Sequence, residues 1–382
     1  MLNSSFAFAV GILASALLPT AARAEPGAAW ALQMRTIHRA YLELLPHAAS
    51  APDFYDPKRK EKNEGLTRRV ADAASGLRKL TPAKDHDPGT GLLVGMFADH
   101  LERAAQEVHR GNLGVARQLL NSTPAYCVAC HTRSDQGPDF SRIGVETPKP
   151  IPGMTSVENA RFLVATRQYQ AALQSYETIL HSIPSDPESA AQWRHAIYGA
   201  LAVSVRVLHD PVRTIAILDE VLSRGFISDG LREDVSAWRK QAEEWRLAPG
   251  ASAISLSQLR ALYEKARAIQ VAPMDRAADL TYLRMSAAAH ELLRGTATGE
   301  SGSEALFLLG ISYEVLRDWD LWTLHEALYE RCIRQAPHTP IAQKCLKRFQ
   351  DSIAMDYVGL ATPPDAEQQL RELEGLARLP AP

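Results

Sequence analysis

The chain has 382 residues, of which 46% are hydrophobic and 23% charged, the composition of an ordinary globular protein. Its 42 Lys and Arg residues nearly balance 44 Asp and Glu residues, and the net charge of −2 gives no basic footprint for nucleic acid. The length suggests two or three domains. The low aromatic content of 7%, with abundant Ala, Leu, Arg and Glu, favours helices.

Residues 1–24 have the pattern of a secretory signal peptide. The apolar run Phe6–Leu18 is too short to span a bilayer. It is followed by Ala22-Arg23-Ala24, a cleavage pattern of small residues. We therefore expect a mature chain that starts at Glu25 and is exported, to the bacterial periplasm, as a soluble protein without stable membrane insertion.

Residues 25–135 contain four segments with a helical periodicity of apolar residues. In the first segment Trp30, Met34, Ile37 and Tyr41 recur at i, i+4, i+7 and i+11 and form one apolar stripe. Short links separate the segments, so the pattern predicts an up-down-up-down four-helix bundle. The predicted helices span 28–48, 61–80, 92–110, and 113 to the motif described next.

The last helix leads into Cys127-Val128-Ala129-Cys130-His131, the C-x-x-C-H signature of covalent haem c attachment. Two thiols at this spacing can add to the two vinyl groups of one porphyrin, and the following imidazole can bind the iron as proximal ligand. On a helix the three side chains share one face, at i, i+3 and i+4. A dithiol redox pair or half of a zinc site would use the same residue types. The predicted export favours haem, because haem is attached covalently outside the cytoplasm.

Ser122-Thr123-Pro124 stands just before the motif. Serine or threonine followed by proline is typical of an N-cap and the first helical position. The pattern therefore predicts that the last helix breaks and restarts directly before the haem-attachment residues.

With these features, residues 28–133 resemble class II c-type cytochromes, the cytochrome c′ group. The resemblance rests on the order of the four helices, on the stretch Arg110–Arg117 and on the motif that ends the last helix. It implies a bundle that holds one covalent haem c, attached through Cys127 and Cys130, with His131 as the proximal iron ligand.

The sixth iron position has several candidates. In an antiparallel bundle Met34 and Met96 reach the haem end, while His38 and His100 lie one turn deeper on the same stripes. Some members of the resembled group carry an apolar residue over the iron, and others a methionine on the first helix, which Met34 resembles in placement. Met34 is therefore our first candidate for the distal ligand and Met96 the second. A histidine or an open site are the alternatives.

Residues 136–155 are rich in Pro and Gly, which is typical of a linker, and residues 156–358 form a second helical region. This region resembles tetratricopeptide repeats, which implies a solenoid of helical hairpins with a concave binding surface. In the tail, 359–382, we expect a short helix that caps the last hairpin. The resemblance is carried by Tyr169–Ala172, Tyr176, Ile179 and Pro184 in one copy and by Leu309-Gly310, Tyr313, Tyr329 and Pro337 in another.

Cys332 and Cys345 flank the turn Ala336–Pro340. On antiparallel helices that rise ~1.5 Å per residue, the two cysteines stand at a similar height. In an oxidising compartment they can form a disulfide across the hairpin. Two separate buried thiols are the alternative.

The sequence thus indicates an exported mono-haem c-type cytochrome that carries electrons and docks to a redox partner protein through its repeats. We predict no catalytic residues, since no metalloprotease, nucleophile-elbow or phosphate-loop motif is present. The alternatives are a haem-based sensor of gas or redox state and a repeat scaffold with an accessory haem. Peroxidase-like turnover at an open iron is a further alternative.

Overall fold

The computed structural model describes residues 26–80, 88–133, 150–248, 254–272, 274–295, 298–319 and 324–379. Within these ranges the chain is helical apart from turns and short connections, and no β-strand occurs. The all-α fold class is therefore confirmed. None of the helices in the same ranges is both long and apolar enough to cross a membrane. The predicted signal peptide and most of the predicted linker lie outside the described residues.

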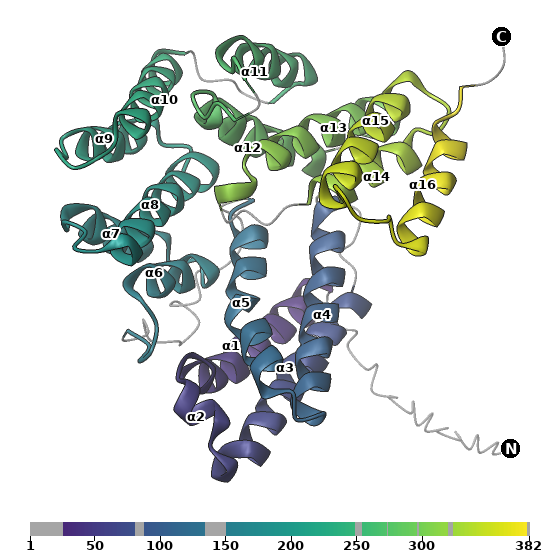
Figure 1. Ribbon diagram of the computed structural model, residues 1–382. Coiled ribbons are helices and arrows are strands. Elements are labelled where there is room, and N and C mark those ends of the chain that lie inside the picture. The colour runs from purple at the N-terminus through teal and green to yellow at the C-terminus, as the bar shows by residue number, and fades with distance from the viewer. Residues whose placement is uncertain are drawn as a thin grey trace, which may run out of the picture.

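The first part of the chain, α1–α5, forms four long antiparallel helices with a short helix in the first connection (Figure 1). α3 packs against both α1 and α4, α5 packs against α4, and α1 meets α5 to close the group, which we call the bundle. The elements are α1 (Pro26–Ala49), α2 (Ala51–Tyr55), η1 (Pro57–Arg59), α3 (Lys60–Lys79), α4 (Pro88–His109) and α5 (Leu113–His131).

The apolar stripes of the sequence become the core of the bundle. Tyr41 and Leu44 of α1, Val70 of α3 and Leu101 of α4 are all buried, as the periodicity predicts. The turn after α4 contains Gly111, whose φ of +83° lies in the left-handed region that glycine adopts without a steric penalty. This turn lets α5 run back along α4, so the C-x-x-C-H motif lies beside the first part of α4.

The remaining helices form a curved row, which we call the arch (Figure 1). Most neighbouring helices in the row pack on each other, α10 and α11 being the exception, and α16 packs on both α14 and α15 at the end. The elements are α6 (Ser156–Ala165), α7 (Tyr169–His181), α8 (Pro187–Leu201) with the π-helical turn η3 (Ala202–Val207), α9 (Pro211–Leu222), α10 (Asp229–Leu247), α11 (Leu256–Ile269), α12 (Asp279–Arg294), α13 (Gly299–Val315), η4 (Arg317–Trp319), α14 (His325–Gln335), α15 (Pro340–Asp356) and α16 (Pro364–Ala377).

Two glycines allow close contact between helices of the arch. A Cβ atom on Gly310 would lie 2.4 Å from Cε1 of Tyr329, and one on Gly199 would lie 2.4 Å from Cζ of Tyr176. Both distances are shorter than two non-bonded carbon atoms tolerate. Each position therefore requires glycine, because any larger residue would collide with the aromatic ring packed on it. The Gly310–Tyr329 contact joins α13 to α14, the hairpin in which the sequence suggested a repeat.

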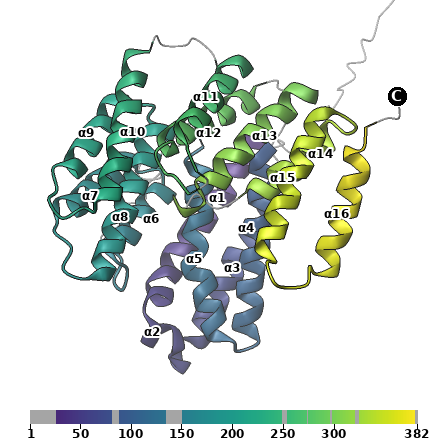
Figure 2. The same cartoon turned by 45° about the horizontal axis from the view of Figure 1, so that its top comes forward.

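The concave side of the arch holds part of the bundle. Figures 1 and 2 both show the ends of α4 and α5 inside the curve of the arch helices. A small cavity between the two parts is lined by Val128 and Thr132 of the bundle and by His195 and Trp319 of the arch. The concave surface that a repeat array would present to a partner is thus partly occupied by the end of α5.

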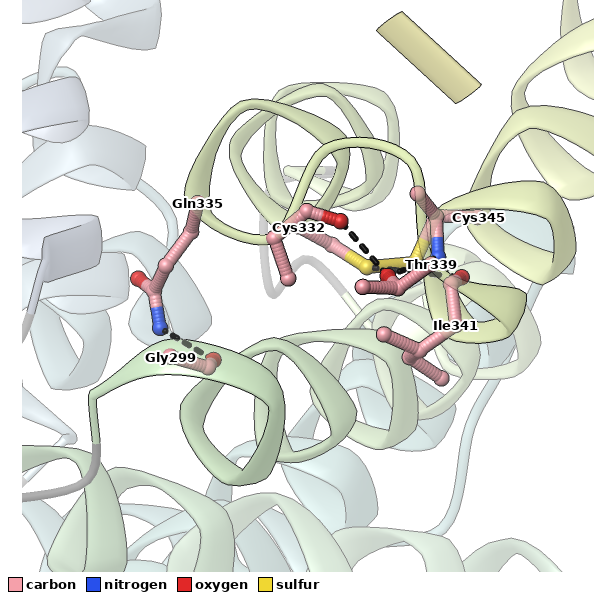
Figure 3. Close-up of a disulfide and its surroundings, with 8 residues drawn as sticks. Gly299, Cys332, Gln335, Thr339, Ile341 and Cys345 are labelled. Atoms are coloured by element: carbon pink, nitrogen blue, oxygen red, sulfur yellow. Dashed lines mark hydrogen bonds between the residues drawn. A yellow bond between two sulfur atoms is a disulfide. The ribbon is translucent and has the colours of Figure 1, made fainter. Parts of the chain in front are cut away.

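A disulfide joins Cys332 of α14 to Cys345 of α15 (Figure 3). Both residues are fully buried, and their Cα atoms lie 6.4 Å apart. Thr339, in the turn between them, accepts a hydrogen bond from the backbone N–H of Ala342 and so caps α15. Gln335 donates to the carbonyl oxygen of Gly299 at 3.2 Å, which ties the same turn to the start of α13. The disulfide therefore fixes the last long hairpin of the arch.

We predict that the double variant Cys332→Ala, Cys345→Ala loses about 2–4 kcal/mol of unfolding free energy, the range typical of a short closed loop. Chemical denaturation followed by far-UV circular dichroism measures the loss. The wild-type protein under reducing conditions is the matched control, because it loses the bond and keeps both side chains. Equal denaturation midpoints for oxidised and reduced wild type would contradict the prediction.

Candidate haem-attachment site

The C-x-x-C-H residues lie in the last two turns of α5. Cys127 and Cys130 carry reduced thiols and are half-buried, while His131 is buried. All three line a single cavity, as expected from their i, i+3, i+4 spacing on one helical face. The site therefore brings two thiols and one imidazole to the same wall.

The predicted break before the motif is wrong, because α5 runs without interruption from Leu113 to His131 with Pro124 inside it. A proline at this position has no N–H for the carbonyl oxygen of Leu120, four residues earlier. The hydroxyl of Tyr41, from α1, donates to that oxygen at 2.7 Å and takes the place of the missing N–H. The helix stays continuous because a side chain from another helix replaces the lost hydrogen bond.

The motif borders a cavity of about 60 Å³ that is partly open to solvent. Its walls are mostly apolar, as a porphyrin requires, and come from five helices. The lining residues beside the motif are Met34, Ile37, His38 and Tyr41 of α1, Leu77 of α3, Leu93, Val94 and Phe97 of α4, Thr123, Pro124 and Tyr126 of α5, and Phe162, Ala165 and Thr166 in and after α6.

A hydrogen bond to the arch fixes which ring nitrogen of His131 carries the proton. Its Nδ1 lies 2.6 Å from the carbonyl oxygen of Ala165, so Nδ1 carries the proton and donates. This hydrogen bond leaves Nε2 as the unprotonated nitrogen, which is the tautomer that binds a metal. Burial lowers the pKa of His131 to about 3, so the imidazole is neutral at physiological pH.

Burial, helped by the neighbouring Cys130, raises the pKa of Cys127 to about 12. Dithiol oxidoreductases instead need a thiol whose pKa is lowered, since the thiolate is the attacking species. Among the described residues, no group of three or more His, Cys, Asp or Glu side chains is arranged to hold a metal ion. Two thiols and one imidazole on a largely apolar wall are the residue types that covalent haem requires.

The structure separates the candidates for the distal ligand. Met34 and His38 line the cavity with His131, whereas Met96 packs against the core without lining it. The Nε2 atom of His100 lies 2.7 Å from the carbonyl oxygen of Leu119, and its ring contacts Tyr126. Of the four residues, Met34 and His38 are therefore the two that line the cavity at the motif.

His38 lies in an apolar environment. Its ring stacks on Phe162 of α6 with 6.3 Å between ring centroids, and burial, together with the charge of Arg39, lowers its pKa to about 4. A neutral imidazole at this place can bind a metal or donate a hydrogen bond. The sequence placed His38 one turn deeper than Met34, and the structure brings both to the cavity.

The sequence did not indicate the wall formed by α6. Thr155 and Glu158 form a capping box that starts this helix, and such a pattern is visible in a sequence. Nothing in the pattern predicts that Phe162 and Ala165 pack against a motif more than thirty residues earlier in the chain.

We predict that Tyr41→Phe costs about 1–3 kcal/mol of unfolding free energy, because it leaves the buried Leu120 carbonyl oxygen without a donor. Thermal or denaturant unfolding of the protein measures the loss. In a Pro124→Ala background, the restored backbone N–H bonds to Leu120 and the cost of Tyr41→Phe should become much smaller. An equal cost in both backgrounds would show that Tyr41 acts in some other way.

Comparison with known proteins gives no assignment for this chain. No protein family, no curated protein and no solved structure matches it. The functional interpretation accordingly rests on the chain's own residues and their arrangement.

Proposed function

We propose that this chain is an exported mono-haem c-type cytochrome that transfers electrons. One observation carries the proposal: Cys127, Cys130 and His131 line the same largely apolar cavity at the end of four antiparallel helices. Two thiols and an imidazole on one helical face match the attachment points and the proximal ligand of a haem c.

Each residue of the site has a definite part in this proposal. Cys127 and Cys130 would form the two thioether bonds, and Nε2 of His131 would bind the iron. The Ala165 carbonyl oxygen fixes the tautomer of that imidazole. A bound haem c supplies a one-electron Fe(III)/Fe(II) couple. The apolar walls lower the local dielectric constant, which strengthens the effect of nearby charges on the site.

We infer that the arch docks the redox partner through its outer helices. The inner side of the curve is partly occupied by α5, as the shared cavity of Val128, Thr132, His195 and Trp319 indicates. Helical hairpins of this kind resemble tetratricopeptide repeats, which serve as protein-binding surfaces. Docking would bring a partner near the haem without requiring a substrate pocket.

The first test is covalent haem attachment. The full chain, exported in a bacterial host that matures c-type cytochromes, should carry one haem that survives denaturation. Denaturing gels stained for haem peroxidase activity, with intact mass, detect it. Cys127→Ala, Cys130→Ala should abolish the stain, while the matched variant Cys332→Ala, Cys345→Ala should keep it. Wild-type protein without covalent haem would refute the proposed function.

The second test concerns the distal side of the iron. We predict that Met34 is the distal ligand, so that Met34→Ala abolishes the methionine–iron charge-transfer band of the oxidised protein and lowers the midpoint potential. Met96→Ala is the control and should change neither property. An unchanged spectrum in Met34→Ala, with a changed one in His38→Ala, would assign the histidine instead. Rapid carbon monoxide binding by the reduced wild type would favour the gas-sensor alternative.

A further inference from the structure

The arch contacts the haem-attachment motif at its last residue. The carbonyl oxygen of Ala165, at the end of α6, accepts a hydrogen bond from Nδ1 of His131 at 2.6 Å. The hydroxyl of Tyr169, at the start of α7, donates to the carbonyl oxygen of His131 at 2.7 Å. One helical hairpin thus holds both the side chain and the backbone of the residue that would bind the iron.

The position of Ala165 at a helix end has an electrostatic consequence. Carbonyl groups in the last turn of a helix have no partner within the helix and carry the negative end of its dipole. Ala165 is the last residue of α6, and its oxygen faces the imidazole. Such an acceptor raises the basicity of the ligand. A more basic ligand stabilises the ferric over the ferrous iron.

The turn between α6 and α7 contains a positive charge, whose effect on the oxidation state of the iron would be opposite to that of the Ala165 carbonyl group. Arg167, with a φ of 57°, lies in this turn, between Ala165 and Tyr169, which both contact His131. Nη1 of Arg167 also lies 3.5 Å from the hydroxyl of Tyr169. A positive charge near the iron disfavours the ferric state. The hairpin therefore contains one group that favours ferric iron, the carbonyl oxygen of Ala165, and one that favours ferrous iron, the guanidinium of Arg167.

We propose that the α6–α7 hairpin is a proximal clamp through which the arch sets the properties of the haem, with Tyr169 as a positioning residue that acts through His131. This inference rests on the proposed haem function. Because Ala165, Tyr169 and Arg167 move with the arch, a displacement of the hairpin alters the hydrogen bond at Nδ1. Coupling of this kind is reciprocal, so attachment of haem should in turn stabilise the hairpin.

Tyr169→Phe is the main test, in the full exported protein with its haem. Loss of the hydroxyl loosens His131 against Ala165 and makes the ligand less basic, so the midpoint potential should rise. We expect a threefold to tenfold change in the Fe(III)/Fe(II) ratio at fixed potential, where tenfold corresponds to about 59 mV for one electron. Optical spectroelectrochemistry measures it. Arg167→Gln should shift the potential in the opposite direction, because it removes a positive charge.

Tyr282→Phe is the matched control. The hydroxyl of Tyr282 donates to Gln270 at 2.9 Å within the arch and touches no residue of the motif. This variant loses a comparable hydrogen bond and should leave the potential unchanged. A role of Tyr169 that is only structural would lower the unfolding midpoint and leave the potential of Tyr169→Phe unchanged as well.

Hydrogen exchange tests the reciprocal effect. Backbone amides of 156–181 should exchange faster in the haemless variant Cys127→Ala, Cys130→Ala than in the wild type, while those of 340–356 should not differ. An unchanged potential in haem-loaded Tyr169→Phe, or equal exchange of 156–181 in both proteins, overturns the clamp alone. Wild-type protein that carries no covalent haem overturns the proposed function and the clamp together.

Discussion

The continuity of α5 through Pro124 is the constraint on which the candidate site depends. Cys127, Cys130 and His131 can line one cavity only if the helix that carries them keeps its register up to its last residue. Proline removes one hydrogen bond from that helix, at the carbonyl oxygen of Leu120, and Tyr41 replaces it from α1. The same tyrosine lines the cavity. The first and last helices of the bundle are therefore joined at the level where the haem would sit.

The burial of His131 follows from the way the bundle and arch pack. A histidine at the end of a helix would otherwise be open to solvent, but Ala165 and Tyr169 of the arch cover His131. In this low-dielectric environment an imidazole resists protonation and a nearby charge acts over a longer range. The residues that follow the linker are therefore part of the site, although the sequence suggests two separate domains.

Local patterns in the sequence predict much of the fold. The stripes of apolar residues locate the four long bundle helices to within a few residues, since helical periodicity reports directly on which face is buried. The spacing of Cys332 and Cys345 about a turn likewise indicates two helices at equal height, and the structure joins them. The attachment motif is visible because its chemistry needs three residues close together in the chain.

Contacts between distant segments are what the sequence does not show. Ser122-Thr123-Pro124 has the local pattern of a helix start, and only the Tyr41 hydroxyl, 79 residues away in sequence, explains why the helix continues. The wall formed by Phe162 and Ala165 depends in the same way on how α6 docks against α5. The local preference of a segment for a helix start does not decide its structure where a tertiary hydrogen bond, which contributes about 1 kcal/mol or more, favours a continuous helix.

The contacts between the arch and the bundle indicate why the two parts belong to one chain. If the arch served only to hold a partner, any connection to the bundle would suffice and its concave side would be open. Instead α5 lies in the curve, and the first arch hairpin contacts His131 on both its ring and its backbone. An event at the arch surface that moves α6 and α7 has a short physical route to His131. Partner docking would then shift the redox equilibrium of the iron, and the redox state of the iron would change the affinity for the partner.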